Sequence, residues 1–164
     1  MVFEAEILAL AQSVLDACRA RGWRIATAES CTGGLVAGAL TAIAGSSDVV
    51  ERGFVAYSNE AKSELLGVPL ETIAAHGAVS AETAAAMAKG AVARAPVDLA
   101  VSVTCIAGPG GATPAKPVGL VLVGLARRDG TCRTERRVLP GDRTAVREAA
   151  LRLALELLQD EAGS

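Results

Sequence analysis

The sequence predicts an α/β fold, a three-layer α/β/α sandwich with a mixed, mostly parallel sheet. Early in the chain, segments with apolar residues at helical spacing alternate with short valine-rich runs, which indicates helices that connect strands. Later, two strand-like runs are joined by Asp129-Gly130, a hairpin signal. The 164 residues, 51% of them hydrophobic, fit one domain of ordinary size, so we expect residues 1–164 to form a single domain.

The first four elements are expected to alternate between helix and strand. Apolar residues recur at helical spacing over residues 4–21, and Gly22 follows as a stop signal. A short strand is predicted over residues 23–28 and a helix of small apolar residues over 32–44. The valine and phenylalanine residues of segment 49–57 then predict a second strand.

Three further helices are predicted before the chain returns to the sheet. Asn59 is expected to cap a short helix over residues 59–66, because asparagine is a favoured cap. Another short helix is predicted over residues 70–76. The third spans residues 80–95, and Pro96 ends it because proline cannot continue a helix.

The remaining strands and the last helix complete the sandwich. Strands are predicted over residues 97–104, 118–127 and 132–139. Segment 105–117 is rich in glycine and proline and is predicted to be a loop. Gly141 or Asp142 caps a final helix that runs to about residue 160, and the tail from Glu161 is expected to be loose.

The charge balance and the cysteines argue against several classes of protein. The net charge of −2 argues against a nucleic acid partner, because binding to the phosphate backbone needs a basic surface. No apolar run spans a membrane, and residues 1–10 do not resemble a signal peptide. We therefore expect no membrane partner and a cytoplasmic protein with reduced thiols. The four cysteines form no C-x-x-C pair and there is one histidine, so we expect no metal and no cofactor.

The segment A-E-S-C-T-G-G carries the strongest chemical signal. It places Ser30 at a predicted turn from strand to helix, where free backbone N–H groups can hold an oxyanion or a phosphate. Ser30 is a candidate nucleophile, although serine is also a common helix cap. Thr32 could do the capping instead, and Gly33 and Gly34 let a ligand approach the backbone. Cys31 is either a second candidate nucleophile or a small packing residue.

Lysine is rare in this chain, because arginine serves as the general surface cation. Only Lys62, Lys89 and Lys116 are lysines, which suggests that some are needed as groups that can lose a proton. Lys62 follows Tyr57 in the segment Y-S-N-E-A-K, near the start of a predicted helix, where the helix dipole and burial both disfavour the charged amine. Neutral Lys62 could be the general base for a serine; the alternative is a solvated surface lysine.

A glycine-rich loop follows Thr104 at the carboxyl end of a buried strand, where ligands bind in open α/β sheets. The loop contains Gly108, Gly110 and Gly111 and leads to Lys116. It is either part of a binding site or a long irregular connection, and loops of this length in compact domains are more often functional.

Two arginines share a helix face near the start of the last helix. Arg143 and Arg147 are one turn apart, so their guanidinium groups could clamp a phosphate or a carboxylate. The alternative is a capped helix with a solvated face.

In their order along the chain, these motifs resemble the CinA C-terminal domain family, whose standalone members include nicotinamide-nucleotide amidases. The set is A-E-S-C-T-G-G, Y-S-N-E-A-K, G-A-V-S, A-G-P-G-G with K-P-V-G, and G-D-R, and it covers about residues 6–158. The resemblance implies an α/β/α domain that forms homo-oligomers. It also implies hydrolysis of the carboxamide of nicotinamide mononucleotide to nicotinic acid mononucleotide and ammonia, so the partner would be a small-molecule nucleotide substrate.

The resemblance also implies roles for individual residues. Ser30 would be the nucleophile and Lys62 the base, supported by Tyr57 and Thr104, with backbone N–H groups near residues 31–33 holding the oxyanion. The remaining candidates would bind substrate: Thr32, Gly33, Gly34, Asn59, Gly108, Gly110, Gly111, Lys116 and Arg143.

One position departs from the family pattern, and two other functions stay open. The family usually has glycine after the threonine of its T-G-x-A-G-P segment, whereas Cys105 follows Thr104 here and would narrow any site that it faces. One alternative is a non-catalytic ligand- or partner-binding domain, which would tolerate the loss of Lys62. The other is a serine–lysine amidase for another small amide, which would not require a phosphate on its substrate.

Overall fold

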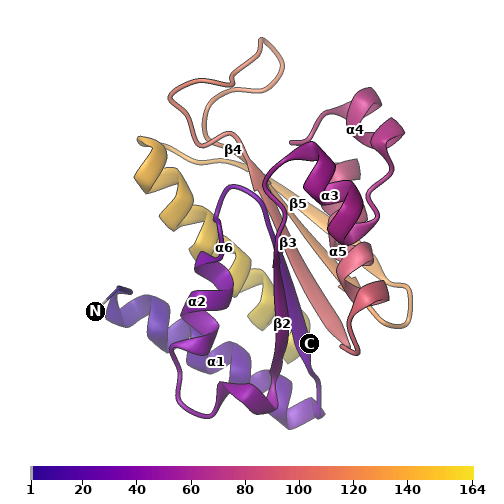
Figure 1. The fold of residues 1–164 in the computed structure, drawn as a ribbon. Helices are drawn as coiled ribbons and strands as arrows, with labels where there is room; N and C mark the ends of the chain where they lie inside the picture. The colour runs from indigo at the N-terminus through magenta and orange to yellow at the C-terminus, as the bar shows by residue number, and fades with distance from the viewer. Residues whose placement is uncertain (1) are drawn as a thin grey trace.

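The computed structural model describes residues 2–164 and has an α/β fold with a five-stranded mixed sheet in the order β2-β1-β3-β4-β5 (Figure 1). The parallel part consists of β1 (Ile25–Glu29), which lies between β2 (Val50–Val55) and β3 (Leu99–Cys105). The antiparallel part adds β4 (Leu120–Arg127) beside β3, and β5 (Cys132–Val138) forms the far edge.

The expectation of a mostly parallel sheet is wrong. Two of the four strand pairings are antiparallel, and each of these joins seven residue pairs, against five in each parallel pairing. The physical reason lies in the loop between β3 and β4, which contains no helix and stays at one end of the sheet (Figure 1). A parallel pairing needs a crossover along the full strand length, so β4 returns antiparallel beside β3.

Helices cover both faces of the sheet (Figure 1). One face carries α1 (Ala5–Arg21), α2 (Leu35–Thr41) and α6 (Arg143–Gly163), and the other carries α3 (Asn59–Leu66), α4 (Leu70–His76) and α5 (Ala81–Arg94). A 3-10 turn, η1 (Ser46–Asp48), precedes β2. No helix within residues 2–164 is both long enough and apolar enough to cross a membrane.

The core is aliphatic, as the scarcity of aromatic residues requires, and its two halves meet at β3. Because side chains alternate along a strand, Val101 and Val103 pack toward α1 and α6, whereas Ala100 packs toward α5. The parallel strands β1, β2 and β3 end at the same edge of the sheet. Whatever follows these three strands is therefore gathered in one place.

The bounds of two helices and the cap of a third differ from the sequence predictions. The helix expected over residues 32–44 spans Leu35–Thr41: it begins late because Gly33 and Gly34 adopt positive φ and form a turn first, and it ends three residues earlier than expected. Ser58, not Asn59, caps α3: its side chain accepts a hydrogen bond from the Ala61 N–H at 3.0 Å. The tail is not loose, since α6 continues to Gly163 and Glu161 is buried.

Candidate active site

The structure brings Ser30 and Lys62 into contact at the edge where the parallel strands end. Ser30 directly follows β1, and its N–H donates to the Val103 carbonyl of β3 at 2.9 Å. Lys62 lies in the first half of α3, and its Nζ donates to Ser30 Oγ at 3.0 Å. A nucleophile and a base within hydrogen-bond distance are the arrangement that activates a serine hydroxyl.

Lys62 is buried, with only 1% of its surface exposed. Its Nζ also donates to the Tyr57 carbonyl oxygen at 2.9 Å, so two oxygens fix the position of the amine. Burial lowers the pKa of Lys62 from its ordinary value of 10.5, because an apolar surrounding disfavours the charged form. The predicted deprotonation therefore has a cause in the structure, and that cause is burial.

The turn that carries Ser30 is held by a residue that the sequence reasoning missed. Glu29 is fully buried, and its carboxylate accepts hydrogen bonds from the Thr32 hydroxyl at 2.6 Å and from the N–H groups of Val36 and Ala37 at 2.9 and 3.0 Å. Thr32 therefore faces Glu29 and does not line the pocket at Ser30. The signal was present in the motif A-E-S-C-T, where an acid precedes the candidate nucleophile.

One backbone N–H group beside Ser30 is available to a ligand in the pocket. Within residues 2–164, the N–H groups of Cys31 and Thr32 have no hydrogen-bond acceptor, whereas the Gly33 N–H donates to the Ser30 carbonyl at 3.1 Å. The Gly33 group is already engaged, and Thr32 is fully buried outside the pocket wall, so the oxyanion donors expected near residues 31–33 reduce to the Cys31 N–H.

Arg143 and Arg147 have different partners, so they do not form the expected pair of anion-binding groups. Arg147 donates to the carbonyl oxygens of Cys31 at 2.9 Å and Thr32 at 3.4 Å, and it thereby supports the turn after Ser30. Arg143 donates to the Gly108 carbonyl at 3.0 Å and to the Tyr57 hydroxyl at 3.1 Å. A guanidinium has five N–H donors, so Arg143 keeps several for a ligand.

A pocket of about 230 Å³ opens at this edge of the sheet. Six of the predicted site residues line it: Ser30, Tyr57, Asn59, Lys62, Thr104 and Arg143. Of the other five lining residues, the sequence indicates Cys31 as an alternative nucleophile and Cys105 as a residue that narrows the site, whereas Ala78, Val79 and Ala107 were not predicted. Seven predicted residues lie outside its wall: Thr32, Gly33, Gly34, Gly108, Gly110, Gly111 and Lys116.

The candidates that lie apart from Ser30 have other partners. The Thr104 hydroxyl lines the pocket but donates to the Ala78 carbonyl at 2.9 Å, and it makes no hydrogen bond with Ser30 or Lys62. The Lys116 amine donates to the His76 carbonyl at the end of α4. Gly110 and Gly111 are exposed in the loop that projects beyond the sheet (Figure 1).

Cys31 and Cys105 form a disulfide across the pocket wall, so the expectation that all thiols are reduced is wrong. Their Cα atoms are 5.7 Å apart, within the range that a disulfide can bridge. The cause is the parallel register, which pairs Glu29 with Val103 and so places the residues two positions further on, Cys31 and Cys105, side by side. Cys18 and Cys132 are free cysteines.

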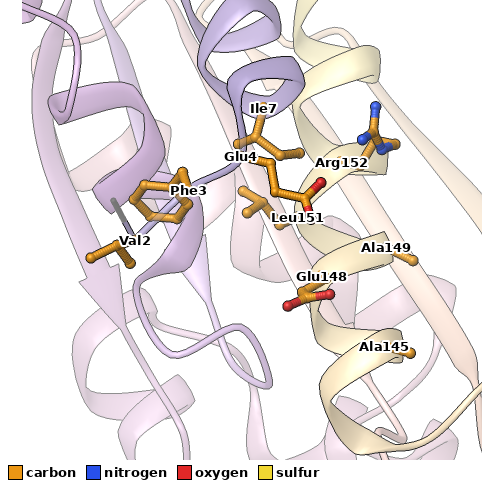
Figure 2. A pocket seen from close by; sticks show the side chains of 9 residues that line it. All are labelled: Val2, Phe3, Glu4, Ile7, Ala145, Glu148, Ala149, Leu151 and Arg152. Atoms are coloured by element: carbon orange, nitrogen blue, oxygen red, sulfur yellow. The ribbon is translucent and has the colours of Figure 1, made fainter.

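A second pocket, of about 290 Å³, lies between the start of α1 and the first half of α6 (Figure 2). Val2, Phe3, Ile7 and Leu151 give it an apolar wall, and its charged residues are two glutamates and Arg152. No serine, cysteine, lysine or histidine lines it, so it lacks a nucleophile and a base. In the described part of the chain, no group of histidine, cysteine and acidic residues is arranged to hold a metal ion.

The fold and the pocket at Ser30 define an α/β protein with a buried serine–lysine pair at the carboxyl ends of parallel strands. The chain belongs to the CinA C-terminal domain family, whose model matches residues 7–162.

Individual relatives extend this likeness. The chain is 50% identical, over 94% of each sequence, to the nicotinamide-nucleotide amidohydrolase PncC of Escherichia coli (strain K12). It is 57% identical over 84% of its length to a CinA-like protein of Mycolicibacterium gilvum, of which that match covers 33%. The chain thus spans about a third of such CinA-like relatives. The crystal structure of the competence/damage inducible protein CihA from Agrobacterium tumefaciens matches with a TM-score of 0.93 and 48% identity, covering 99% of this chain and 98% of that one.

Proposed function

We propose that the protein is a nicotinamide-nucleotide amidase that hydrolyses the carboxamide of nicotinamide mononucleotide to nicotinic acid mononucleotide and ammonia. The observation that carries the proposal is the 3.0 Å contact between Lys62 Nζ and Ser30 Oγ in the pocket. The full-length similarity to PncC supports the choice of substrate. We further propose that it acts in the cytoplasm as a homo-oligomer.

In the proposed reaction, neutral Lys62 takes the proton of Ser30 as the Ser30 oxygen attacks the carboxamide carbon. The free N–H group of Cys31 stabilises the negative charge that develops on the carbonyl oxygen. Protonated Lys62 then gives its proton to the leaving nitrogen, and ammonia departs. Water, activated by Lys62 in the same way, releases the acid and restores Ser30.

The surrounding residues have supporting roles in this proposal. The Tyr57 carbonyl positions the Lys62 amine, and Thr104 shapes the pocket wall. Arg143, exposed at the mouth of the pocket with unused N–H donors, binds the 5′-phosphate, because a guanidinium matches phosphate oxygens. Asn59 lines the same mouth and adds a polar contact to the substrate.

The experiment measures ammonia release from nicotinamide mononucleotide by the purified protein, with EDTA present. We expect turnover by the wild type and a loss of at least about 1,000-fold in kcat for Ser30→Ala and for Lys62→Met, because each removes one half of the pair. Lys89→Met is the matched control, since Lys89 is exposed on α5 and away from the pocket. Melting temperatures show whether each variant is folded.

Two outcomes would favour the alternatives. Full activity in the folded Ser30→Ala variant would remove Ser30 as the nucleophile. Saturable binding of the nucleotide without turnover would indicate a binding domain, whereas equal turnover of nicotinamide without its ribose phosphate would indicate an amidase for another small amide.

A further inference from the structure

The Cys31–Cys105 disulfide joins the two strand ends that build the candidate active site. Cys31 directly follows Ser30, and Cys105 directly follows Thr104 at the end of β3. The bond therefore ties the turn that carries the candidate nucleophile to the central strand of the sheet. No function described above uses this bond.

The disulfide fixes a backbone group that the proposed reaction needs. The Cys31 N–H is the free donor beside Ser30 in the pocket wall, and the Cys31 carbonyl accepts a hydrogen bond from Arg147 at 2.9 Å. With its side chain also bound to Cys105, Cys31 is constrained through both its backbone and its sulfur. An oxyanion donor is effective because it is already oriented before the charge develops, so this constraint favours catalysis.

The bond is within reach of a small thiol that enters the pocket. Both cysteines line the pocket, and Cys105 is partly exposed whereas Cys31 is 6% exposed. The free cysteines do not compete for this site, because Cys18 is a buried residue of α1 and Cys132 lies in β5.

We propose that Cys31–Cys105 is a thiol–disulfide exchange site in the wall of the substrate pocket, and that its reduction by a small dithiol slows the reaction at Ser30. The effect on rate rests on the proposed amidase function. The exchange itself does not.

The exchange takes place in two balanced steps. A thiolate of the dithiol attacks one protein sulfur, so the Cys31–Cys105 bond breaks and a mixed disulfide forms. The second thiol of the reductant loses its proton and attacks the reductant's other sulfur, which is bonded to the protein in the mixed disulfide. This releases the second protein thiolate. The dithiol becomes a cyclic disulfide, and the two protein sulfurs each carry one proton at the end.

The first measurement counts thiols and does not depend on activity. The protein purified without reductant is unfolded in guanidinium chloride and titrated with Ellman's reagent. We expect two reactive thiols per chain, from Cys18 and Cys132, and four after treatment with dithiothreitol and its removal. Four thiols in the air-oxidised protein would overturn the proposal.

The second measurement compares nicotinamide mononucleotide hydrolysis by the oxidised and reduced protein. Reduction is expected to lower kcat about tenfold and to change KM less than twofold, because the donor is loosened and not removed. Cys105→Ala is expected to have the low kcat in both states, whereas the control Cys132→Ala responds like the wild type. An unchanged kcat after verified reduction, or an equal redox response in Cys105→Ala, would overturn the proposal.

A third measurement separates this proposal from the proposed function. If neither redox state hydrolyses the nucleotide, the amidase function fails, and hydrogen exchange still tests the bond. Reduction is expected to speed exchange at least severalfold at Val36 and Ala37, whose N–H groups bind Glu29 just after the tethered turn. Unchanged exchange at both amides would overturn the proposal.

Discussion

At the scale of single residues, Lys62 combines a long side chain with a buried position. Two oxygens hold its amine, the Ser30 hydroxyl and the Tyr57 carbonyl, and within residues 2–164 no carboxylate forms an ion pair with it. The fold therefore lowers the pKa of the amine by burial and supplies no opposite charge to restore it. Burial of the amine therefore lowers the free energy of unfolding, and it also favours the neutral amine that can act as a base.

This cost predicts a dependence of stability on pH. The pKa of Lys62 is lower in the folded than in the unfolded protein, so as pH falls below 10.5 the unfolded state binds the proton first. The free energy of unfolding therefore decreases as pH falls from 10.5 to the pKa of Lys62 in the folded protein. Lys62→Met should therefore be more stable than the wild type at pH 7, and the difference should shrink toward pH 10.5. Urea unfolding of both proteins at the two pH values measures this; a difference independent of pH would contradict it.

Glu29 provides a second prediction at this scale. Glu29→Gln replaces one carboxylate oxygen by an amide nitrogen, which cannot accept a hydrogen bond from the Val36 or Ala37 N–H. At least one of the three hydrogen bonds to the side chain is then lost, and two N–H donors face each other in its place. We expect a loss of about 2 kcal/mol in the free energy of unfolding and a kcat at least about tenfold lower, with KM little changed. Chemical denaturation and steady-state kinetics measure the two effects. Glu156→Gln, exposed on α6, is the matched control.

The candidate nucleophile and base could be predicted from the sequence because each lies in a local motif at a strand or helix end. Their contact, at 3.0 Å, follows from the adjacent parallel strands β1 and β2. The partners of Arg147 and Cys105 could not be predicted in the same way. Arg147 lies 116 residues from Cys31, and the disulfide spans 74 residues, so both depend on the sheet order and register.

At the scale of elements, the position of Lys62 depends on how closely α3 packs on α5. Gly90 of α5 faces the last turn of α3, where a Cβ would overlap the Leu66 carbonyl oxygen. The two helices can approach this closely only because Gly90 has no side chain.

Gly90→Ala should therefore push the end of α3 away from α5. Because that overlap is with backbone, we expect a loss of at least about 2 kcal/mol in the free energy of unfolding. We also expect a lower kcat, because Lys62 moves with its helix and small displacements at reacting groups are costly. Denaturant unfolding and kinetics test this against Gly163→Ala, a helical glycine whose added Cβ meets no atom within 4 Å. Equal stability of the two variants would contradict the packing argument.

Helix and strand positions followed from local patterns, whereas sheet direction did not. The Asp129-Gly130 hairpin and the glycine stops after α1 and α3 are signals carried by a few neighbouring residues. Whether β4 runs parallel or antiparallel to β3 depends on which end of the sheet the connecting loop returns to. The glycine and proline content of segment 105–117 predicts a loop but does not predict the end of the sheet at which it returns.

At the scale of the whole molecule, the end of α6 is anchored to the far edge of the sheet. The Glu161 carboxylate accepts hydrogen bonds from Arg127 of β4 at 2.6 Å and from Arg133 of β5 at 2.8 Å. Burial opposes the charge, but these hydrogen bonds from Arg133 and Arg127 hold the pKa of Glu161 below its ordinary value. The last turn of the chain is thus part of the folded structure.

The lowered pKa of Glu161 predicts an acid-sensitive anchor. The folded pKa is below the unfolded value of 4.5, so this contribution to stability is present above about pH 4.5 and is lost as pH falls through the folded pKa. Glu161→Gln should lose about 2 kcal/mol at pH 7 and much less near pH 3. Urea unfolding at both pH values measures the difference, with Glu156→Gln as control. A loss of the same size at pH 3 would argue against the ionic contribution.

Tyr57 has a consequence for how the molecule can be observed. It is the single tyrosine of the chain, it lies in the pocket wall with 62% of its surface exposed, and its hydroxyl accepts a hydrogen bond from Arg143. The single tryptophan, Trp23, lies just before β1, at the opposite end of that strand from Ser30, and stacks with Arg21 and Arg127. The phenol of the one tyrosine therefore lies where a ligand would bind, and a tyrosine difference spectrum can follow the binding of a ligand that does not itself absorb at these wavelengths.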